Sequence, residues 1–278
     1  MSFKKALLSQ GLGLILVLSA PAHALDVFSL NVFDQLQGDW PANFREKRME
    51  LMAGFVNKSK PAIVVFQEAR GILPGSEKGG SDSVDGEKIK KLYPHRKYLH
   101  EMIGKDGASY GYWIGAKNKP QHWIEDGFSF PGGVERKVIG AVWKKAIGKE
   151  CLGVLGLHLS YQNSEVRQKE AAWLIDWLKN HEKDCKQWLV VGDFNAAGKD
   201  KEMQLLFEAG LKSLYKEEKP TVGPFNSIRA IYGKDKPNLT IDWALGWNLS
   251  GSAELVLHEA DKEGNWVSDH AGVLVKLR

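Results

Sequence analysis

Apolar and polar positions near the start of the chain follow the pattern of a strand, a helix and a second strand. Residues 25–33 are mostly apolar, residues 43–57 repeat apolar side chains near the helical period, and residues 62–66 are fully apolar. A helix between two such runs is typical of a crossover unit, so we expect the two strands to be parallel.

The same order returns later, with a strand at 151–160, a helix at 164–181 and a strand at 187–192. Between Arg70 and Gly86 the chain is rich in Gly, Ser and charge, which predicts a long loop. Further strands are predicted at 98–102, 109–116, 138–144, 239–245, 253–258 and 271–277. With no internal repeat or linker, we predict one α/β or α+β domain, with mixed sheets covered by helices.

The first 24 residues have the pattern of a secretory signal peptide. Lys4 and Lys5 precede the apolar run 11–18, and Ala22-His23-Ala24 is a small-x-small cleavage site. We therefore expect a mature chain starting at Leu25, in a periplasm or outside the cell. The alternative is a buried N-terminal helix, but the apolar run leads into a proline and not into helix-period polar residues.

Charge and composition add little about a partner. The chain has 278 residues, of which 43% are hydrophobic and 26% charged, as in globular proteins. Without Lys4 and Lys5, 36 basic residues face 34 acidic ones, too even a balance to indicate nucleic acid by bulk electrostatics. Lys88, Lys90 and Lys91, or Lys144 and Lys145, are candidates for a local basic face, although a solvated surface explains them better than a binding patch.

Two cysteines in an exported chain raise the question of a disulfide. Cys151 opens the strand that carries His158, and Cys185 precedes the strand that carries Asp193. If these strands are parallel neighbours, both cysteines lie at the same level, and we predict a bridge. The alternative is two buried free thiols.

Acids and amides stand where apolar strands end. Glu68 closes one apolar run, and an ionised carboxylate there is costly to bury without a partner. Asp193 and Asn195 are two positions apart, so in extended chain both point to one side. A metal ion, a water molecule or a phosphoryl oxygen would suit these groups. The alternatives are a solvent-facing Glu and an Asx turn.

Histidines with nearby acids stand beside the later strands. Asp269 and His270 directly precede the last strand, and Asp242 lies in another apolar stretch as the candidate acid that orients His270. His158 lies on the strand expected next to that of Asp193. A hydrogen-bonded core histidine and a polar loop are the respective alternatives.

Together these segments resemble the endonuclease/exonuclease/phosphatase superfamily, which includes DNase I-like nucleases, bacterial sphingomyelinases and inositol polyphosphate phosphatases. The resemblance spans residues 25–278. It implies a four-layer sandwich, with two mixed β-sheets flanked by helices and a site at one edge of the sheets. The residues that carry it are Asn31, Glu68, His158, Gly192 to Asn195, Asp242, Asp269 and His270.

The resemblance also implies roles. Asn31 and Glu68 would bind a divalent metal, Mg²⁺ with Mn²⁺ or Ca²⁺ as alternatives, with Asp269 as a further ligand. The implied catalytic residues are His158, Asp193, Asn195, Asp242 and His270, with His270 as the general base. Arg136 and Asn195 would contact the phosphate.

One position departs from the pattern. DNase I-like enzymes carry a Glu that orients the histidine equivalent to His158, expected near residues 109–112, where this chain has Ser, Tyr, Gly and Tyr. Asp106 is the candidate substitute.

These expectations converge on an exported, Mg²⁺-dependent phosphodiester hydrolase, with an endonuclease as the leading hypothesis. A sphingomyelinase or phospholipase C acting on lipid phosphodiesters is the alternative, as is a phosphatase of the same superfamily. A binding module without catalysis is a third possibility that no residue supports. The expected substrate is nucleic acid or phospholipid; we predict no protein partner and expect a monomer.

Overall fold

A computed structural model describes residues 25–33, 44–71, 87–104, 107–147, 150–229 and 237–278. The predicted signal peptide, Asp106 and most of the predicted loop between Arg70 and Gly86 lie outside these residues. Within them, no helix is long and apolar enough to cross a membrane.

One sheet carries the first predicted crossover unit. Strands β1 and β2 are parallel, and helix α1 (Phe44–Ser59) connects them, which confirms the prediction. The sheet has six strands in the order β11-β12-β1-β2-β4-β3. Their bounds are β1 Leu25–Asn31, β2 Ile63–Gly71, β3 His95–Ile103, β4 Ser109–Ala116, β11 Gly251–Val256 and β12 Gly272–Leu277.

The second sheet carries the other predicted unit. Strands β7 and β8 are parallel and helix α3 (Ser164–Asn180) connects them, again as predicted. The order of the six strands is β5-β6-β7-β8-β10-β9. Their bounds are β5 His122–Phe128, β6 Arg136–Ile147, β7 Glu150–His158, β8 Trp188–Asp193, β9 Lys212–Ser213 and β10 Asp242–Trp247.

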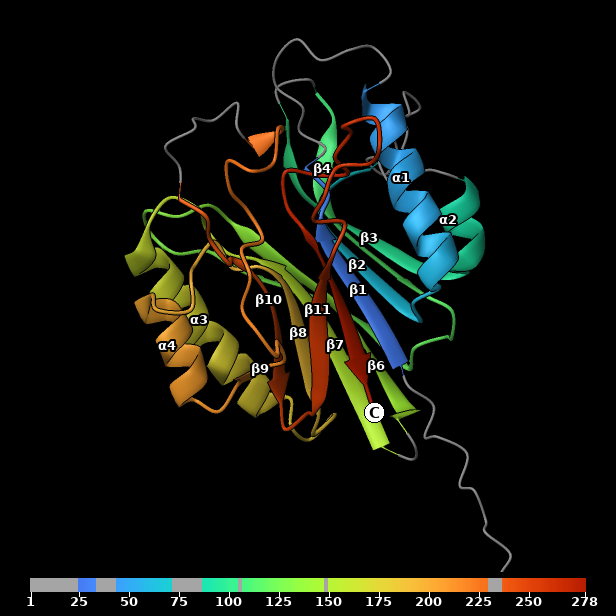
Figure 1. Ribbon diagram of the computed structural model, residues 1–278. Coiled ribbons are helices and arrows are strands. Elements are labelled where there is room, and N and C mark those ends of the chain that lie inside the picture. The colour runs from blue at the N-terminus through green and yellow to red at the C-terminus, as the bar shows by residue number, and fades with distance from the viewer. Residues whose placement is uncertain (1–24, 34–43, 72–86, 105–106, 148–149, 230–236) are drawn as a thin grey trace, which may run out of the picture.

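The two sheets lie face to face and helices cover their outer faces (Figure 1). Helices α1 and α2 (Glu87–Leu92) pack on the first sheet, and α3 and α4 (Lys201–Glu208) pack on the second. Alternation along β2 shows how: Val65 enters the core between the sheets, whereas Val64 and Phe66 enter the core under α1. The four-layer sandwich of two mixed sheets is therefore confirmed.

The structure corrects the start of the predicted loop. Arg70 and Gly71 belong to β2, which resumes its pairing with β4 after an irregularity between Phe66 and Ala69. Beyond the bulge the strand loses its simple alternation of apolar and polar residues, and the sequence pattern there predicts a loop instead of a strand. Strands β5 and β9 and helices α2 and α4 were not predicted. Strand β5 lies at a sheet edge, where polar side chains are tolerated.

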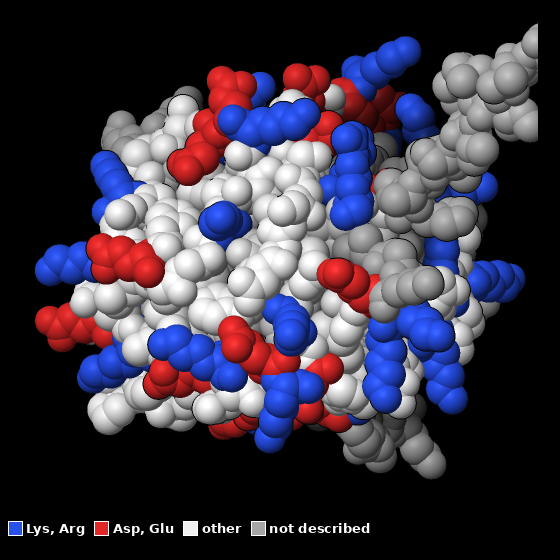
Figure 2. Space-filling model, turned by 90° about the horizontal axis from the view of Figure 1, so that it is seen from below, with Lys and Arg blue, Asp and Glu red and all other residues white. Residues whose placement is uncertain are grey.

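Charged side chains lie mainly around the rim of the end of the molecule opposite the carboxyl end of β1, and the centre is mostly uncharged (Figure 2). Basic and acidic side chains are mixed along most of this rim, and basic ones prevail at the lower right. Lys144 and Lys145 are exposed, and the side chains of Lys88 and Lys90 lie outside the described residues. Charges of both signs on this surface fit the small net charge of the chain.

A disulfide links Cys151 at the start of β7 to Cys185 just before β8, with a Cα–Cα distance of 5.6 Å. The two cysteines lie at the same level because β7 and β8 are parallel neighbours. The bridge closes the crossover that contains α3, so it restricts the unfolded chain around the segment that brings His158 and Asp193 together.

Replacing both cysteines by serine is expected to lower the free energy of unfolding by about 3 to 4 kcal/mol, because the unfolded chain regains the entropy of an open loop. Urea denaturation of the double variant and the oxidised wild type measures this difference. The wild type under reducing conditions serves as a control and should match the variant. An unchanged denaturation midpoint would show that the bridge adds no stability.

Candidate active site

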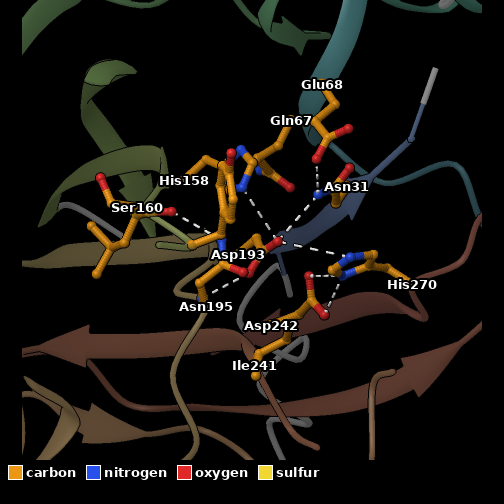
Figure 3. A network of polar contacts seen from close by, with 12 residues as sticks. Asn31, Gln67, Glu68, His158, Ser160, Asp193, Asn195, Ile241, Asp242 and His270 are labelled. Carbon is orange, nitrogen blue, oxygen red and sulfur yellow. Dashed lines mark hydrogen bonds and ion pairs between the residues drawn. The ribbon is translucent and has the colours of Figure 1, made fainter. Parts of the chain in front are cut away.

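The polar residues singled out from the sequence meet at one end of both sheets (Figure 3). Asn31, His158 and Asp193 are the last residues of β1, β7 and β8. Asp242 begins β10, where it pairs in register with Asp193 because the two strands are antiparallel. His270 lies two residues before β12. The directions of the strands thus bring residues that are far apart in the sequence to the same end of the two sheets.

Two residues of the site, Glu68 and Asn195, have a left-handed backbone conformation. Glu68 has a φ of 52° and lies in the irregularity of β2, next to Gln67, which pairs with Asn31. Asn195 has a φ of 49° directly after β8. Asparagine tolerates this conformation, but it is uncommon for a glutamate and costs free energy. The irregular backbone turns the Glu68 carboxylate towards Asn31, whose Nδ2 donates to Glu68 Oε1 at 3.0 Å.

Asp193 is the centre of the site. Its Oδ2 accepts a hydrogen bond from Asn31 Nδ2 at 3.2 Å, and it lies 3.5 Å from His158 Nε2 and 3.8 Å from His270 Nε2. Its Oδ1 accepts from the backbone N–H of Asn195 at 2.8 Å. One carboxylate therefore contacts a residue of the first sheet, both histidines and the turn after its own strand.

His270 and Asp242 form a buried pair. His270 Nδ1 lies 2.9 and 3.1 Å from the two carboxylate oxygens of Asp242, as predicted for an orienting acid. Burial lowers the pKa of His270, but the carboxylates of Asp242, Asp269 and Asp193 outweigh it and raise that pKa to about 10. Nε2 is left pointing at the centre of the site.

Buried carboxylates repel one another here. Burial, together with the charges of Asp269 and Asp193, raises the pKa of Glu68 to about 7, against the lowering effect of Asn31. Burial likewise raises the pKa of Asp193 to about 6, with Asp242 contributing. Among the described residues, no Lys or Arg forms an ion pair with Glu68 or Asp193. Such a donor set suits a divalent cation.

Two groups of residues could hold that cation. The predicted one, Asn31 and Glu68, adjoins Asp193, and exchanging the amide oxygen and nitrogen of Asn31 would turn its oxygen towards the carboxylates. The other consists of Asp193, Asp242 and His270. In the second group Asp242 is already bonded to His270, and Mg²⁺ prefers oxygen to nitrogen, so we favour the first group.

Asp269 lies beside the site without joining its closest contacts. It is fully buried, its Oδ2 accepts from Arg229 Nη1 at 3.1 Å, and its Oδ1 lies 3.8 Å from His270 Nε2. The preceding Ser268 donates its hydroxyl to the backbone oxygen of Asn31 at 2.6 Å. The segment before β12 is thereby tied to the end of β1, which keeps Asp269 next to the Asn31–Glu68 pair.

Arg136 and Asn195, the predicted phosphate contacts, converge on one carbonyl. Leu159 O accepts from Asn195 Nδ2 at 2.9 Å and from Arg136 Nη2 at 3.2 Å. Arg136 is buried, and its Nη1 also contacts Glu101 Oε2 at 3.3 Å. The structure therefore brings both residues to the side of the site formed by the turn after His158.

The acid near His158 differs from the expectation. Residues 109–112 supply none, and His158 Nδ1 is buried without a hydrogen-bond partner among the described residues. Sequence reasoning missed Glu101, on the neighbouring strand β3, which accepts from Tyr112 Oη at 2.8 Å and pairs with Arg136. Glu101 is bonded to Tyr112 and Arg136 and not to His158, so no described residue takes the place of the expected acid. Burial, with Arg136 and His270, holds the pKa of His158 well below its usual value.

The fold and site together define a two-sheet sandwich with a buried acid–imidazole centre at one end. A model of the endonuclease/exonuclease/phosphatase family matches residues 30–270, and the chain belongs to this family. No curated protein matches the sequence.

Solved structures share the fold at low identity. Beta toxin from Staphylococcus aureus is 19% identical with a TM-score of 0.69, covering 91% of this chain and 100% of its own. D. rerio TDP2 complexed with single strand DNA product is 18% identical with a TM-score of 0.67, covering 92% and 99%. A family member from Leptotrichia buccalis is 15% identical with a TM-score of 0.68, covering 91% and 99%.

Glu68→Gln is expected to raise the free energy of unfolding of the metal-free protein at pH 8 by about 1 to 3 kcal/mol, because it removes a buried and crowded negative charge. The pKa of Glu68 is raised from 4.5 to about 7 in the folded state. Ionisation therefore destabilises the fold increasingly as pH rises through this window, and the gain should be small at pH 4.

Urea denaturation with a chelator present, at both pH values, measures this effect. Glu208→Gln is the matched control, since Glu208 is exposed on α4 and its substitution should change nothing. A Glu68→Gln variant that is less stable than the wild type at pH 8 would contradict the crowding of carboxylates.

Proposed function

We propose that this chain is an exported, divalent-metal-dependent phosphodiester hydrolase, and that its substrate is nucleic acid, which it cuts as an endonuclease. The observation that carries the proposal is the His270 imidazole, held at Nδ1 by Asp242 with Nε2 facing Asp193. Such a pair can take a proton from water beside groups that hold a phosphate.

Each residue of the site has its own role in the proposed reaction. Asp242 fixes the tautomer and orientation of His270, which accepts the proton of the attacking water at Nε2. Asp193 and Asn195 orient the water and the phosphate, and Arg136 contributes positive charge on the phosphate side. His158, 3.5 Å from Asp193, lies where it could stabilise the leaving oxygen.

A divalent cation held by Asn31 and Glu68, with Asp269 nearby, would supply positive charge to the phosphoryl oxygens and offset the carboxylates that keep the pKa of His270 high. Mg²⁺ is our first choice because the donors are oxygens of carboxylates and an amide, with Mn²⁺ and Ca²⁺ as alternatives.

Nucleic acid is supported by the likeness to D. rerio TDP2 complexed with single strand DNA product. A lipid phosphodiester is the second candidate, because exposed apolar and aromatic side chains lie at or just after the ends of strands that lead towards the site. Met102 and Ile103 at the end of β3 are 42% and 48% exposed, and Tyr161 after β7 is 67% exposed. Apolar and aromatic side chains of this kind suit a membrane interface.

Purified protein with Mg²⁺ is expected to hydrolyse bis(p-nitrophenyl) phosphate, and a chelator should abolish the reaction. His270→Ala should lower kcat by about 10²- to 10⁴-fold, because the proton acceptor is lost. Release of p-nitrophenol measures both effects. His258→Ala is the control, since His258 is exposed and outside the site. Unchanged turnover by His270→Ala would remove His270 from the mechanism.

Plasmid DNA, RNA and sphingomyelin vesicles, each supplied with Mg²⁺, distinguish the substrates. We expect nicking of the plasmid, seen as conversion of supercoiled to open-circular DNA, and no release of phosphocholine from vesicles. Because the same site should act on every substrate, His270→Ala must abolish whichever activity is found. Hydrolysis of vesicles alone would replace the endonuclease with a lipid phosphodiesterase.

A further inference from the structure

The peptide unit between Leu159 and Ser160 links the site to helix α3. On one side its carbonyl, Leu159 O, accepts from Asn195 Nδ2 at 2.9 Å and from Arg136 Nη2 at 3.2 Å. On the other side its N–H, that of Ser160, donates to Glu170 Oε2 at 2.9 Å. Since a trans peptide is planar, its N–H and C=O point in opposite directions, and fixing one fixes the other.

Glu170 is placed to hold this peptide unit in one orientation. It lies on the inner face of α3 and is fully buried, as is Ser160. Its second oxygen, Oε1, accepts from the Ser160 hydroxyl at 2.5 Å, so both carboxylate oxygens bind the same residue. Hydrogen bonds to an ionised acceptor are stronger than neutral ones, and a buried one is costly to break.

Arg167, one helical turn before Glu170, binds the same loop at the next carbonyl, that of Ser160. Its Nη1 donates to Ser160 O at 3.0 Å, and its Nε donates to Glu202 Oε1 on α4 at 2.5 Å. Glu202 also accepts from the Ser164 hydroxyl at 2.8 Å. Glu202 is thus as buried and as well bonded as Glu170, but it does not touch the Leu159–Ser160 peptide.

We infer that Glu170 is a positioning residue that acts through the Leu159–Ser160 peptide on Asn195 and Arg136. Without its carboxylate the peptide can rotate, and Leu159 O then leaves the two side chains that are proposed to contact the phosphate. The consequence for turnover rests on the proposed function. The consequence for the geometry does not.

Glu170→Met keeps the volume and helical preference of the side chain and removes both acceptors. We expect it to lower kcat on bis(p-nitrophenyl) phosphate about 10- to 100-fold, because small displacements of positioning groups have effects of this size. Glu170→Gln, which retains an acceptor for the Ser160 N–H, should stay within about 3-fold of the wild type. Glu202→Met is the matched control, with a similar loss of melting temperature and little loss of kcat.

A double-mutant cycle identifies the route of the effect. If Glu170 acts through Asn195, the loss caused by Glu170→Met should shrink several-fold in an Asn195→Ala background, whereas independent effects multiply. Full multiplication, or equal losses of kcat in Glu170→Met and Glu202→Met, would overturn the inference. If Glu170→Met does not fold, Glu170→Asp, which withdraws the carboxylate by one methylene, takes its place in the same cycle.

NMR tests the geometry without any substrate. The side-chain NH₂ signals of Asn195 should shift in Glu170→Met and stay in place in Glu202→Met, because only the former releases Leu159 O. An unchanged Asn195 signal in Glu170→Met would overturn the inference even if the enzyme is active. A wild type that hydrolyses no phosphodiester would instead overturn the proposed function, and the NMR result would still decide the geometry.

Discussion

The contact between Asn31 and Asp193 is where the two sheets meet at the site, and most other contacts depend on it. Asn31 ends a strand of the first sheet and Asp193 ends a strand of the second, yet their side chains lie 3.2 Å apart. A slip of one residue in either strand would turn the side chain to the opposite face. The apolar core between the sheets therefore determines the site as much as the polar residues do, since it sets the level at which both sheets end.

The parallel pairs of the fold could be predicted because their signal is local. Apolar runs on either side of a helical segment indicate β1, α1 and β2, and again β7, α3 and β8, and the same reasoning placed Cys151 opposite Cys185. The continuation of β2 beyond Phe66 was missed because a bulge interrupts the alternation. Edge strand β5 was missed because its exposed positions carry the same residues as a loop.

The residues of the site also fall into those that the sequence pattern could indicate and those that it could not. Residues at strand ends could be found because a polar side chain after an apolar run is conspicuous, as with Asp193 and Glu68. Glu101 and Glu170 could not be found, because a single acidic residue within a strand or a helix usually faces solvent. Only the tertiary structure shows that Glu101 turns inward to Tyr112 and Arg136, and that Glu170 is buried against Ser160.

Helix α1 supports the site through Arg48, and it does so without pairing with Glu68 or Asp193. Arg48 is fully buried and donates to the backbone oxygens of Val32, Phe33 and Val267. Val32 and Phe33 directly follow Asn31, and Val267 lies two residues before Asp269. Among the described residues, the guanidinium thus satisfies these backbone carbonyls and forms no ion pair with Glu68 or Asp193. A direct ion pair would hold Glu68 or Asp193 equally well but would neutralise it. Fixing the backbone instead leaves the negative charge in place for a cation.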